Sequence, residues 1–336
     1  MTLPQTDLPR IAIATGDPAG IGPEISLKAA MDARVNRMCR PLLVGDRTAI
    51  ESHARASALT PSWRFIAEPR DAVWDGHTVN VLESPIPGGG FAFGVADADH
   101  GRAALGSARR AIQAALAGEV EAVVAAPQTE TSIAMAGIHF DGYPSFVARE
   151  TGLDEHDVFL MHCFEDRRIA HCTLHCSVRE AVDLITHDRV GRVIRATDAA
   201  LKQLAAPSRR IFVSGLNPHA GEGGLFGREE IEVIAPAIAA ARAAGIDVEG
   251  PFGADTMFHK RDCGAYIVML HDQGHITSKL LAFARTAGLA IGSPILFSSV
   301  AHGSAFDIAG KNLAKPDAMI EAIGRLANVG LERQAA

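Results

Sequence analysis

Cysteines are few in this chain of 336 residues, and long apolar runs and basic stretches are missing. The five cysteines are odd in number and lack the spacing of a disulfide framework, which favours reduced thiols. No uninterrupted apolar run approaches ~20 residues, so we expect no membrane span. A net charge of -7 without a basic stripe argues against a nucleic-acid binder. Because the N-terminus has no basic start followed by an apolar core, we see no signal peptide and expect a cytoplasmic protein.

Short apolar runs alternate with amphipathic segments along most of the chain. This alternation predicts an α/β fold with a largely parallel sheet, and the length suits two domains or one large one. Asp99 is the expected N-cap of a long helix. The expected strands are 9–15, 41–45, 63–67, 120–126, 158–161, 168–175, 211–216 and 267–270, and the expected helices are 23–34, 47–58, 99–116, 190–204 and 316–327.

Two glycine-rich segments fail the tests for familiar nucleotide loops. Gly16–Ile25 lies between an expected strand and an expected helix, but it does not read Gly-x-Gly-x-x-Gly, so we decline a Rossmann interpretation. A tight turn needs glycines for its backbone but does not need the carboxylates of Asp17 and Glu24, so the turn alone does not explain this segment. Ser84–Gly94 contains three consecutive glycines without a following Gly-Lys-Ser/Thr, and we interpret it as a loop or hinge.

The most polar strand end lies at His271–His275, which reads His-Asp-Gln-Gly-His after the apolar run Ile267–Leu270. Lys279 follows about one helical turn later. Ligands of open α/β sheets bind beyond the carboxyl ends of the strands. This stretch is therefore a candidate for one side of an active site.

Three histidines, His175, His219 and His271, share a topological place, each at or after the end of an expected strand. A lone histidine there is usually a surface residue, but three histidines with an open position form the ligand set of a Lewis-acid metal such as zinc. A rival local site, His171 and His175 with their adjacent cysteines, fails because a strand separates these histidines by roughly 13 Å.

The segment His302–Asp307 offers small residues that let a flat ring approach the backbone, with Asp307 available to a ribose or adenine. The alternative is an ordinary turn before a helix. His302–Gly310 resembles the adenine-side loop of the isocitrate and isopropylmalate dehydrogenase superfamily. This resemblance points to His302, Gly303, Ser304, Ala305 and Asp307 as the cofactor-binding residues.

The chain as a whole resembles the 4-hydroxythreonine-4-phosphate dehydrogenase family of pyridoxal phosphate biosynthesis. The motifs that carry the resemblance are Gly16–Glu24, Leu216–Gly224, Gly253–Thr256 and Leu270–Gly274. It implies a divalent metal bound by His175, His219 and His271, for which we expect zinc, and a substrate faced by Lys279 and Asp255. It also implies NAD or NADP in a cleft between two α/β domains, and a homodimer across which the active site is completed. We expect a discontinuous first domain of residues 1–130 plus 295–336 and a second domain of residues 131–294.

Several positions depart from the members that act on a phosphorylated substrate. Tyr143 and Pro144 stand where those members carry a His-Thr pair, and Gly288 and Phe297 stand where they carry Asn and Arg. Lys279 alone remains of the phosphate-facing set, and losing a bidentate cation weakens the binding of a dianion. Phe140–Ser145, His271–Ile276 and Ser298–Ala305 are instead similar to the terephthalate cis-dihydrodiol dehydrogenase branch.

That branch implies NAD-linked oxidative decarboxylation of an unphosphorylated cyclic diol carboxylate, with Tyr143, Lys279, Gly288 and Phe297 at the substrate. Lys279 and Asp255 are the expected catalytic residues, by proton transfer or by orienting the alcohol. Tyr143 either bonds a substrate carboxylate or packs in a wall. Two other functions stay open: a metal-dependent hydrolase or lyase that uses the three histidines without NAD, and a binding protein without catalysis.

Overall fold

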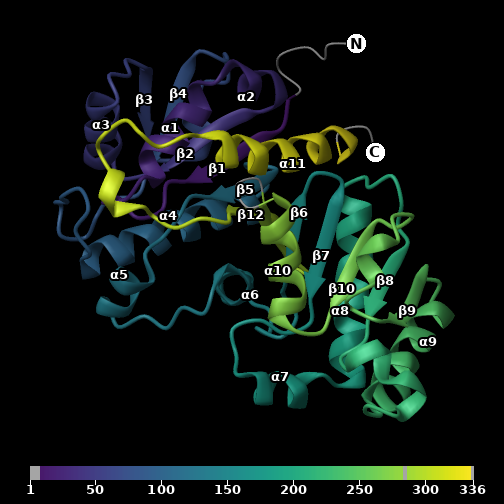
Figure 1. Ribbon diagram of the computed structural model, residues 1–336. Coiled ribbons are helices and arrows are strands. Elements are labelled where there is room, and N and C mark those ends of the chain that lie inside the picture. Colours follow the sequence, from purple (N-terminus) through teal and green to yellow (C-terminus); the bar gives the residue numbers. More distant parts are fainter. Residues whose placement is uncertain (1–7, 283–285, 334–336) are drawn as a thin grey trace. The chain divides into compact units, whose positions relative to one another are not determined.

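The computed structural model describes residues 8–282 and 286–333, and these divide into two compact units (Figure 1). One unit extends to Thr151 and includes the segment from Pro294 onward, and the other is Gly152–Ser293. No helix among the described residues is both long enough and apolar enough to cross a membrane.

The first unit is built on six parallel strands in the order β3-β4-β2-β1-β5-β12. Strands buried on both faces read as continuous apolar runs, as β1 and β5 do. The strands are β1 (Arg10–Ala14), β2 (Arg40–Gly45), β3 (Ser62–Ile66), β4 (Thr78–Glu83), β5 (Ala122–Ala125) and β12 (Leu296–Val300). The helices are α1 (Gly22–Met31), α2 (Ala33–Met38), α3 (Arg47–Ala56), α4 (Ala98–Leu116), α5 (Glu130–Met135), α6 (Tyr143–Thr151) and α11 (Asp317–Arg333).

The second unit has the strand order β11-β6-β7-β10-β8-β9. The first two pairings are antiparallel, and β7, β10, β8 and β9 run parallel. Its strands are β6 (Phe159–Phe164), β7 (Arg167–His171), β8 (Ile211–Ser214), β9 (Val248–Phe252), β10 (Ala265–Val268) and β11 (Ala287–Ile291). Its helices are α7 (Val178–Leu184), α8 (His187–Gln203), α9 (Ala235–Ala243) and α10 (His271–Ala282), with short turns η2 (Pro218–Gly224) and η3 (Glu230–Ile234).

These pairings confirm the expected α/β class with a largely parallel sheet, while several element boundaries differ. The helix expected over 23–34 ends at Met31, because Asp32 adopts extended backbone and its side chain caps α2. Asp97 caps α4 in place of Asp99, whose N–H donates to the Asp97 carboxylate. The strand expected over 168–175 ends at His171.

The first unit takes in residues 131–151, which we expected in the second domain. Helices α5 and α6 both pack against α4, and α4 covers β1 and β2. Arg109 on α4 also donates to Glu150 on α6 at 2.9 Å. These contacts explain why the division falls after Thr151 and not near residue 130.

Candidate functional site

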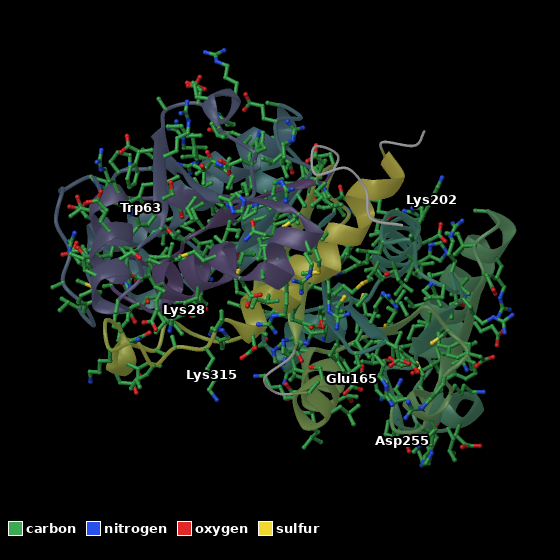
Figure 2. All side chains as sticks on the ribbon, turned by 90° about the horizontal axis from the view of Figure 1, so that it is seen from above. Lys28, Trp63, Glu165, Lys202, Asp255 and Lys315 are labelled. Atoms are coloured by element: carbon green, nitrogen blue, oxygen red, sulfur yellow. The ribbon has the colours of Figure 1, made fainter. Side chains whose placement is uncertain are left out.

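One edge of the second unit carries the three predicted metal ligands and the predicted catalytic Asp255. Because β7, β10, β8 and β9 are parallel neighbours, their carboxyl ends share this edge. His175 follows β7, His271 begins α10 soon after β10, and His219 lies in η2 after β8. Asp255, labelled in Figure 2, is exposed after β9. The polar stretch His271–His275 is thus the first turn of a helix.

His175 and His271 face each other across this edge, with ring centres 5.7 Å apart. Two imidazoles on one tetrahedral zinc have ring centres roughly 5 Å apart, given Zn–N bonds of about 2.0–2.1 Å. The Asp272 carboxylate lies 2.6 Å from His271 Nδ1, which keeps that nitrogen protonated and leaves Nε2 for a metal. Both histidines line a cavity of about 620 Å³. The donor set and the space fit a metal ion.

The loop that carries His219 has an unusual backbone. His219, Ala220 and Glu222 are non-glycine residues at φ of 53°, 51° and 43°. Each such residue costs about 1–3 kcal/mol and persists only where its surroundings enforce it. The buried Glu230 carboxylate supplies that enforcement, since it accepts the backbone N–H groups of Leu216 and Asn217 at 2.7 Å each. Strain of this kind is typical of functional loops.

Gln273 connects two of the strand ends. Its Oε1 accepts the N–H groups of Met269 and Leu270 at 2.9 and 3.0 Å, and its Nε2 donates to the Gly215 carbonyl at 3.2 Å. The ends of β10 and β8 are therefore held together beside His271 and His219. The strand-end pattern assigned no role to either Gln273 or Glu230, although Gln273 lies two residues after His271. Glu230 is 11 residues from His219 in the sequence, so its contact with the loop comes from the fold.

His219 does not join the other two predicted ligands as a compact group. Its loop is exposed and lies against Gly253, where a Cβ would be 3.8 Å from the His219 Cα and 2.8 Å from an Asp255 oxygen. His219 and Asp255 are thus close to the same glycine. Within residues 8–282 and 286–333, the histidines whose ligand atoms do gather within 4.8 Å are His162, His171 and His275.

Lys279 shares a stripe of α10 with His271 and His275, because residues four apart lie on one helix face. The His271 and His275 rings stack with centres 3.7 Å apart. Burial, together with the positive charges that His271 and Lys279 can carry, lowers the pKa of His275 to about 4. The exposed Lys279 ammonium can reach an anionic group that approaches this face.

In the first unit, Tyr143 and Phe297 form a closed apolar contact. Their ring centres are 5.0 Å apart, and their exposed fractions are 8% and 1%. The Tyr143 hydroxyl donates to the Ala126 carbonyl at 3.2 Å, and burial raises the pKa of Tyr143. Of the two roles left open for Tyr143, these contacts match packing in a wall. Gly288 belongs to the second unit, where it pairs with His162 inside β11.

The segment expected to bind the cofactor touches the glycine-rich loop after β1 in the first unit. The Ile21 N–H donates to the Ser304 carbonyl at 2.9 Å, and a Cβ on Gly20 would lie 2.7 Å from the Ser304 Cβ. Ala305 adopts a φ of 42° before a short turn that contains the exposed Asp307. Nothing lies within 4 Å of a Cβ built on Gly303, next to the exposed His302. The backbone here is open to a flat ring.

Comparison with known proteins gives a consistent family. Residues 37–326 match the family described as pyridoxal phosphate biosynthetic protein PdxA. The chain is 39% identical over 317 residues to a 1,2-dihydroxy-3,5-cyclohexadiene-1,4-dicarboxylate dehydrogenase of Comamonas sp, covering 94% of this chain and 96% of that protein. It is also 39% identical over 319 residues to a protein of Symbiobacterium thermophilum provisionally named D-threonate 4-phosphate dehydrogenase, covering 94% and 95%.

Solved structures agree with this assignment. A 4-hydroxythreonine-4-phosphate dehydrogenase from Klebsiella pneumoniae has a TM-score of 0.85 at 35% identity, covering 96% of this chain and 99% of that one. A terephthalate 1,2-cis-dihydrodiol dehydrogenase from Burkholderia xenovorans has a TM-score of 0.71 at 40% identity, covering 96% and 98%. The expected dehydrogenase fold is confirmed.

Proposed function

Since the chain belongs to the PdxA family and is a dehydrogenase of that family, we propose that it oxidatively decarboxylates an unphosphorylated hydroxy or diol carboxylate with NAD or NADP and a divalent metal. The leading candidate substrate is the terephthalate cis-dihydrodiol, 1,2-dihydroxy-3,5-cyclohexadiene-1,4-dicarboxylate. Its product would be protocatechuate.

The contact between Tyr143 and Phe297 carries the choice of an unphosphorylated substrate. In the family members that act on a phosphorylated substrate, the residues at these positions are expected to face the phosphate. Here the two positions carry packed aromatic rings, and the Tyr143 hydroxyl already donates to the Ala126 carbonyl. A phosphate dianion would lose charge-assisted hydrogen bonds worth about 1.5–3 kcal/mol each. Two such losses lower affinity on the order of a hundredfold or more. A ring carboxylate needs fewer donors, and Lys279 supplies one.

The proposed metal ligands are His175, His219 and His271. A divalent ion held by these residues would supply Lewis-acid chemistry, which lowers the pKa of a substrate alcohol and offsets the negative charge left by decarboxylation. Asp272 orients His271, while Glu230 and Gln273 position the loops beside the ligands. Zinc suits this nitrogen set best.

The chemistry balances with these residues. A bound nicotinamide would accept a hydride from the carbinol carbon while a base takes the hydroxyl proton, which leaves a ketone β to the carboxylate. Carbon dioxide would then depart, and its bonding electrons would become the enolate double bond, which completes the aromatic ring; protonation of the enolate oxygen gives the catechol. Lys279 binds the remaining carboxylate or transfers the proton, and Asp255 orients the alcohol or Lys279.

The cofactor is proposed to bind along residues 302–307. The open backbone at Gly303 and the exposed Asp307 support this proposal, since one admits a flat ring and the other can accept ribose hydroxyls. The contact between Gly20 and Ser304 holds the segment against the loop that follows β1.

A homodimer that completes the site is also proposed. Exposed apolar side chains follow each predicted ligand: Val178 at 72% exposure after His175, Leu225 at 72% after His219, and Leu280 at 81% after His271. Apolar side chains gathered around a polar site are typical of a protein interface. A second copy covering this edge would bury them.

The alternative is a dehydrogenase acting on a phosphorylated hydroxy acid. It is favoured by the relative provisionally named for D-threonate 4-phosphate, whose identity equals that of the dihydrodiol dehydrogenase. Comparing kcat/KM for the cyclic diol dicarboxylate, D-threonate 4-phosphate and 4-phosphohydroxythreonine, at matched NAD and metal, decides between the two. We expect the diol to exceed both phosphates by about a hundredfold or more. Faster turnover of either phosphate would refute our assignment.

A further inference from the structure

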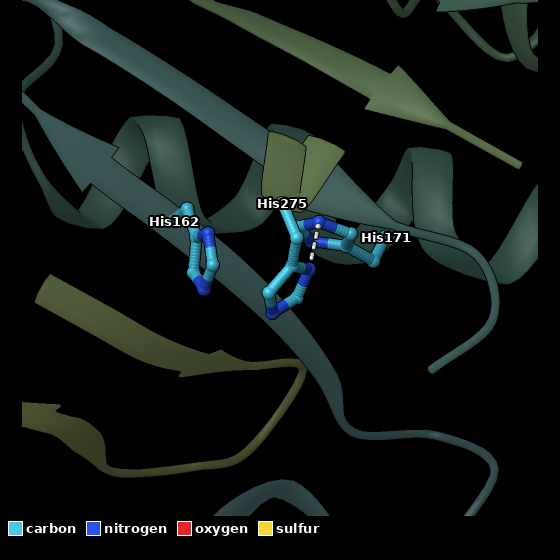
Figure 3. A group of neighbouring side chains, drawn as sticks. All are labelled: His162, His171 and His275. Atoms are coloured by element: carbon cyan, nitrogen blue, oxygen red, sulfur yellow. Dashed lines mark hydrogen bonds between the residues drawn. The ribbon is translucent and has the colours of Figure 1, made fainter. Parts of the chain in front are cut away.

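A second group of histidines lies inside the second unit, behind the proposed catalytic edge. In the β6–β7 hairpin His162 pairs with Ile169, so His171, two residues further along, is its diagonal neighbour on the same face. Helix α10 packs on these strands and contributes His275 (Figure 3). His162 and His171 are 5% and 1% exposed. Three imidazoles from three elements thus converge in the interior.

The ligand atoms of the three rings all lie within 4.8 Å of one another. His275 Nδ1 is 3.1 Å from His171 Nε2. Two nitrogens bound to one zinc ion at about 2.0–2.1 Å would be roughly 3.3 Å apart in tetrahedral geometry. The His162 ring centre lies 4.2 Å from that of His275 and 5.1 Å from that of His171. The spacing of this pair is close to that of two zinc ligands, and the third ring adjoins both. His275 Nδ1 also lies 3.2 Å from the His271 carbonyl, so it is the donor in the hydrogen-bonded arrangement and its proton would have to move to Nε2 for Nδ1 to bind an ion.

Hydrogen bonds on the far side of two rings suit metal ligation. His171 Nδ1 lies 3.2 Å from the Leu160 carbonyl, so it carries the proton and leaves Nε2 with a lone pair. His162 Nδ1 lies 2.9 Å from the Ser278 hydroxyl, which itself donates to the His275 carbonyl at 3.1 Å. His162 Nδ1 is therefore the donor and its Nε2 is also free of a proton. Metal-ligating histidines donate their other nitrogen in this way.

The backbone makes room for this arrangement at Gly274. A Cβ there would lie 2.3 Å from His171 Nε2, so any side chain would displace the ring.

We propose that His162, His171 and His275 bind a zinc-type divalent ion at an interior site, separate from the ligand set His175, His219 and His271. Three neutral nitrogens and a water suit zinc. The Lys279 ammonium, whose charge disfavours protonation of His162 and His275, also opposes a bound cation. The competing arrangement is a hydrogen-bonded histidine cluster without an ion.

The test is metal stoichiometry in the tag-free, full-length protein. The protein is stripped with a chelator, reloaded with zinc or cobalt(II), desalted, and its metal content per chain is measured by mass spectrometry. The variants are His162→Leu and His171→Leu for the interior site, His219→Ala for the proposed catalytic site, and His187→Ala as an exposed control. Circular dichroism checks folding, and His162→Asn, which keeps a polar group near Ser278, replaces a variant that fails to fold.

We expect two ions per chain in the wild type and in His187→Ala, and one ion in each of the other variants. Cobalt(II) absorption in the visible region should lose one component in His162→Leu. A His162 or His171 variant that binds as many ions as the wild type overturns the proposal. So does a wild type with a single ion that only His219→Ala removes. If His162→Leu removes an ion and His219→Ala removes none, the interior site stands and the proposed catalytic ligand set fails.

Discussion

Glu230 and Glu232 lie two residues apart on one turn and differ completely in surroundings. Glu230 is 3% exposed and accepts three hydrogen bonds, from the Leu216 and Asn217 backbone and from Asn217 Nδ2. Glu232 pairs with Arg228 at the surface. We expect Glu230→Gln to reduce the free energy of unfolding by about 1.5–3 kcal/mol, because charge-assisted bonds to the strained loop are lost. Glu232→Gln should change it by less than about 0.5 kcal/mol. Urea unfolding measures both, and equal effects would contradict the role given to Glu230.

His53 gives a prediction about pH. Burial lowers the pKa of His53 below its usual 6.5, while the Pro18 carbonyl at 2.9 Å partly opposes this shift. The unfolded chain therefore binds the proton more readily, so the contribution of His53 to stability is complete above about pH 6.5 and is lost as pH falls. Between pH 6.5 and the lowered pKa, the free energy of unfolding of His53→Leu should fall less steeply with falling pH than that of the wild type. The two slopes should differ by up to about 1.4 kcal/mol per pH unit.

The control for this prediction is His187→Leu, since His187 is exposed at the start of α8. Its unfolding free energies at pH 7 and pH 5 should differ as much as those of the wild type. If His53→Leu also shows the wild-type difference, then His53 is not held neutral by burial.

At the scale of elements, the sequence predicted best the strands that are buried along their whole length. Both faces of strands such as Ile211–Ser214 are buried, so the strand appears in the sequence as a short, nearly continuous apolar run. Strand β4 was not expected, because Asn80 interrupts its apolar residues. The structure compensates by pairing the Asn80 amide with both the N–H and the carbonyl of Val73. A hydrophobic pattern shows that a polar residue interrupts a strand, but it cannot show that the residue has hydrogen-bond partners there.

The candidate site shows the same limit. Strand ends pointed to His175, His219 and His271, because parallel strands bring their carboxyl ends to one edge. His162 and His171 could not be assigned, since their meeting depends on hairpin register and on how α10 packs against it. Neither property can be read from spacing alone.

The contact between the loop after β1 and the segment 302–307 gives a prediction at this scale. A Cβ at residue 20 would lie 2.8 Å from the Ser304 backbone oxygen, so Gly20→Ala must separate the two loops and weaken the Ile21–Ser304 bond. We expect NAD affinity to fall about tenfold or more, which corresponds to roughly 1.4 kcal/mol. Gly90→Ala is the matched control, because nothing lies within 4 Å of its Cβ. Calorimetric titration of NAD into both variants measures the difference, and unchanged affinity in Gly20→Ala would place the cofactor elsewhere.

At the scale of the whole molecule, each compact unit buries its own core, yet the edge with the proposed ligands keeps apolar side chains in solvent. On α10 alone, Ile276, Leu280 and Leu281 are 56%, 81% and 48% exposed. In an isolated chain, leucines at such positions stay in water and contribute no burial free energy. Burying each of them in an interface would contribute about 1.5–3 kcal/mol. Their location beside His271 would connect the proposed association of subunits to the completion of the site.

The proposed homodimer therefore makes a prediction about association. Leu280→Asp replaces an exposed apolar side chain by a charge, and two-fold symmetry introduces the change twice. Two lost leucine contacts of about 1.5–3 kcal/mol each raise the dimer dissociation constant about a hundredfold or more. Leu116→Asp is the control, since Leu116 is 47% exposed at the end of α4 in the first unit. In sedimentation equilibrium, the wild type and Leu116→Asp should dimerise at micromolar concentration, while Leu280→Asp should be monomeric and should lose activity in parallel. A fully active monomeric wild type would show that a single chain completes the site, and undiminished dimerisation of Leu280→Asp would locate the interface on another surface.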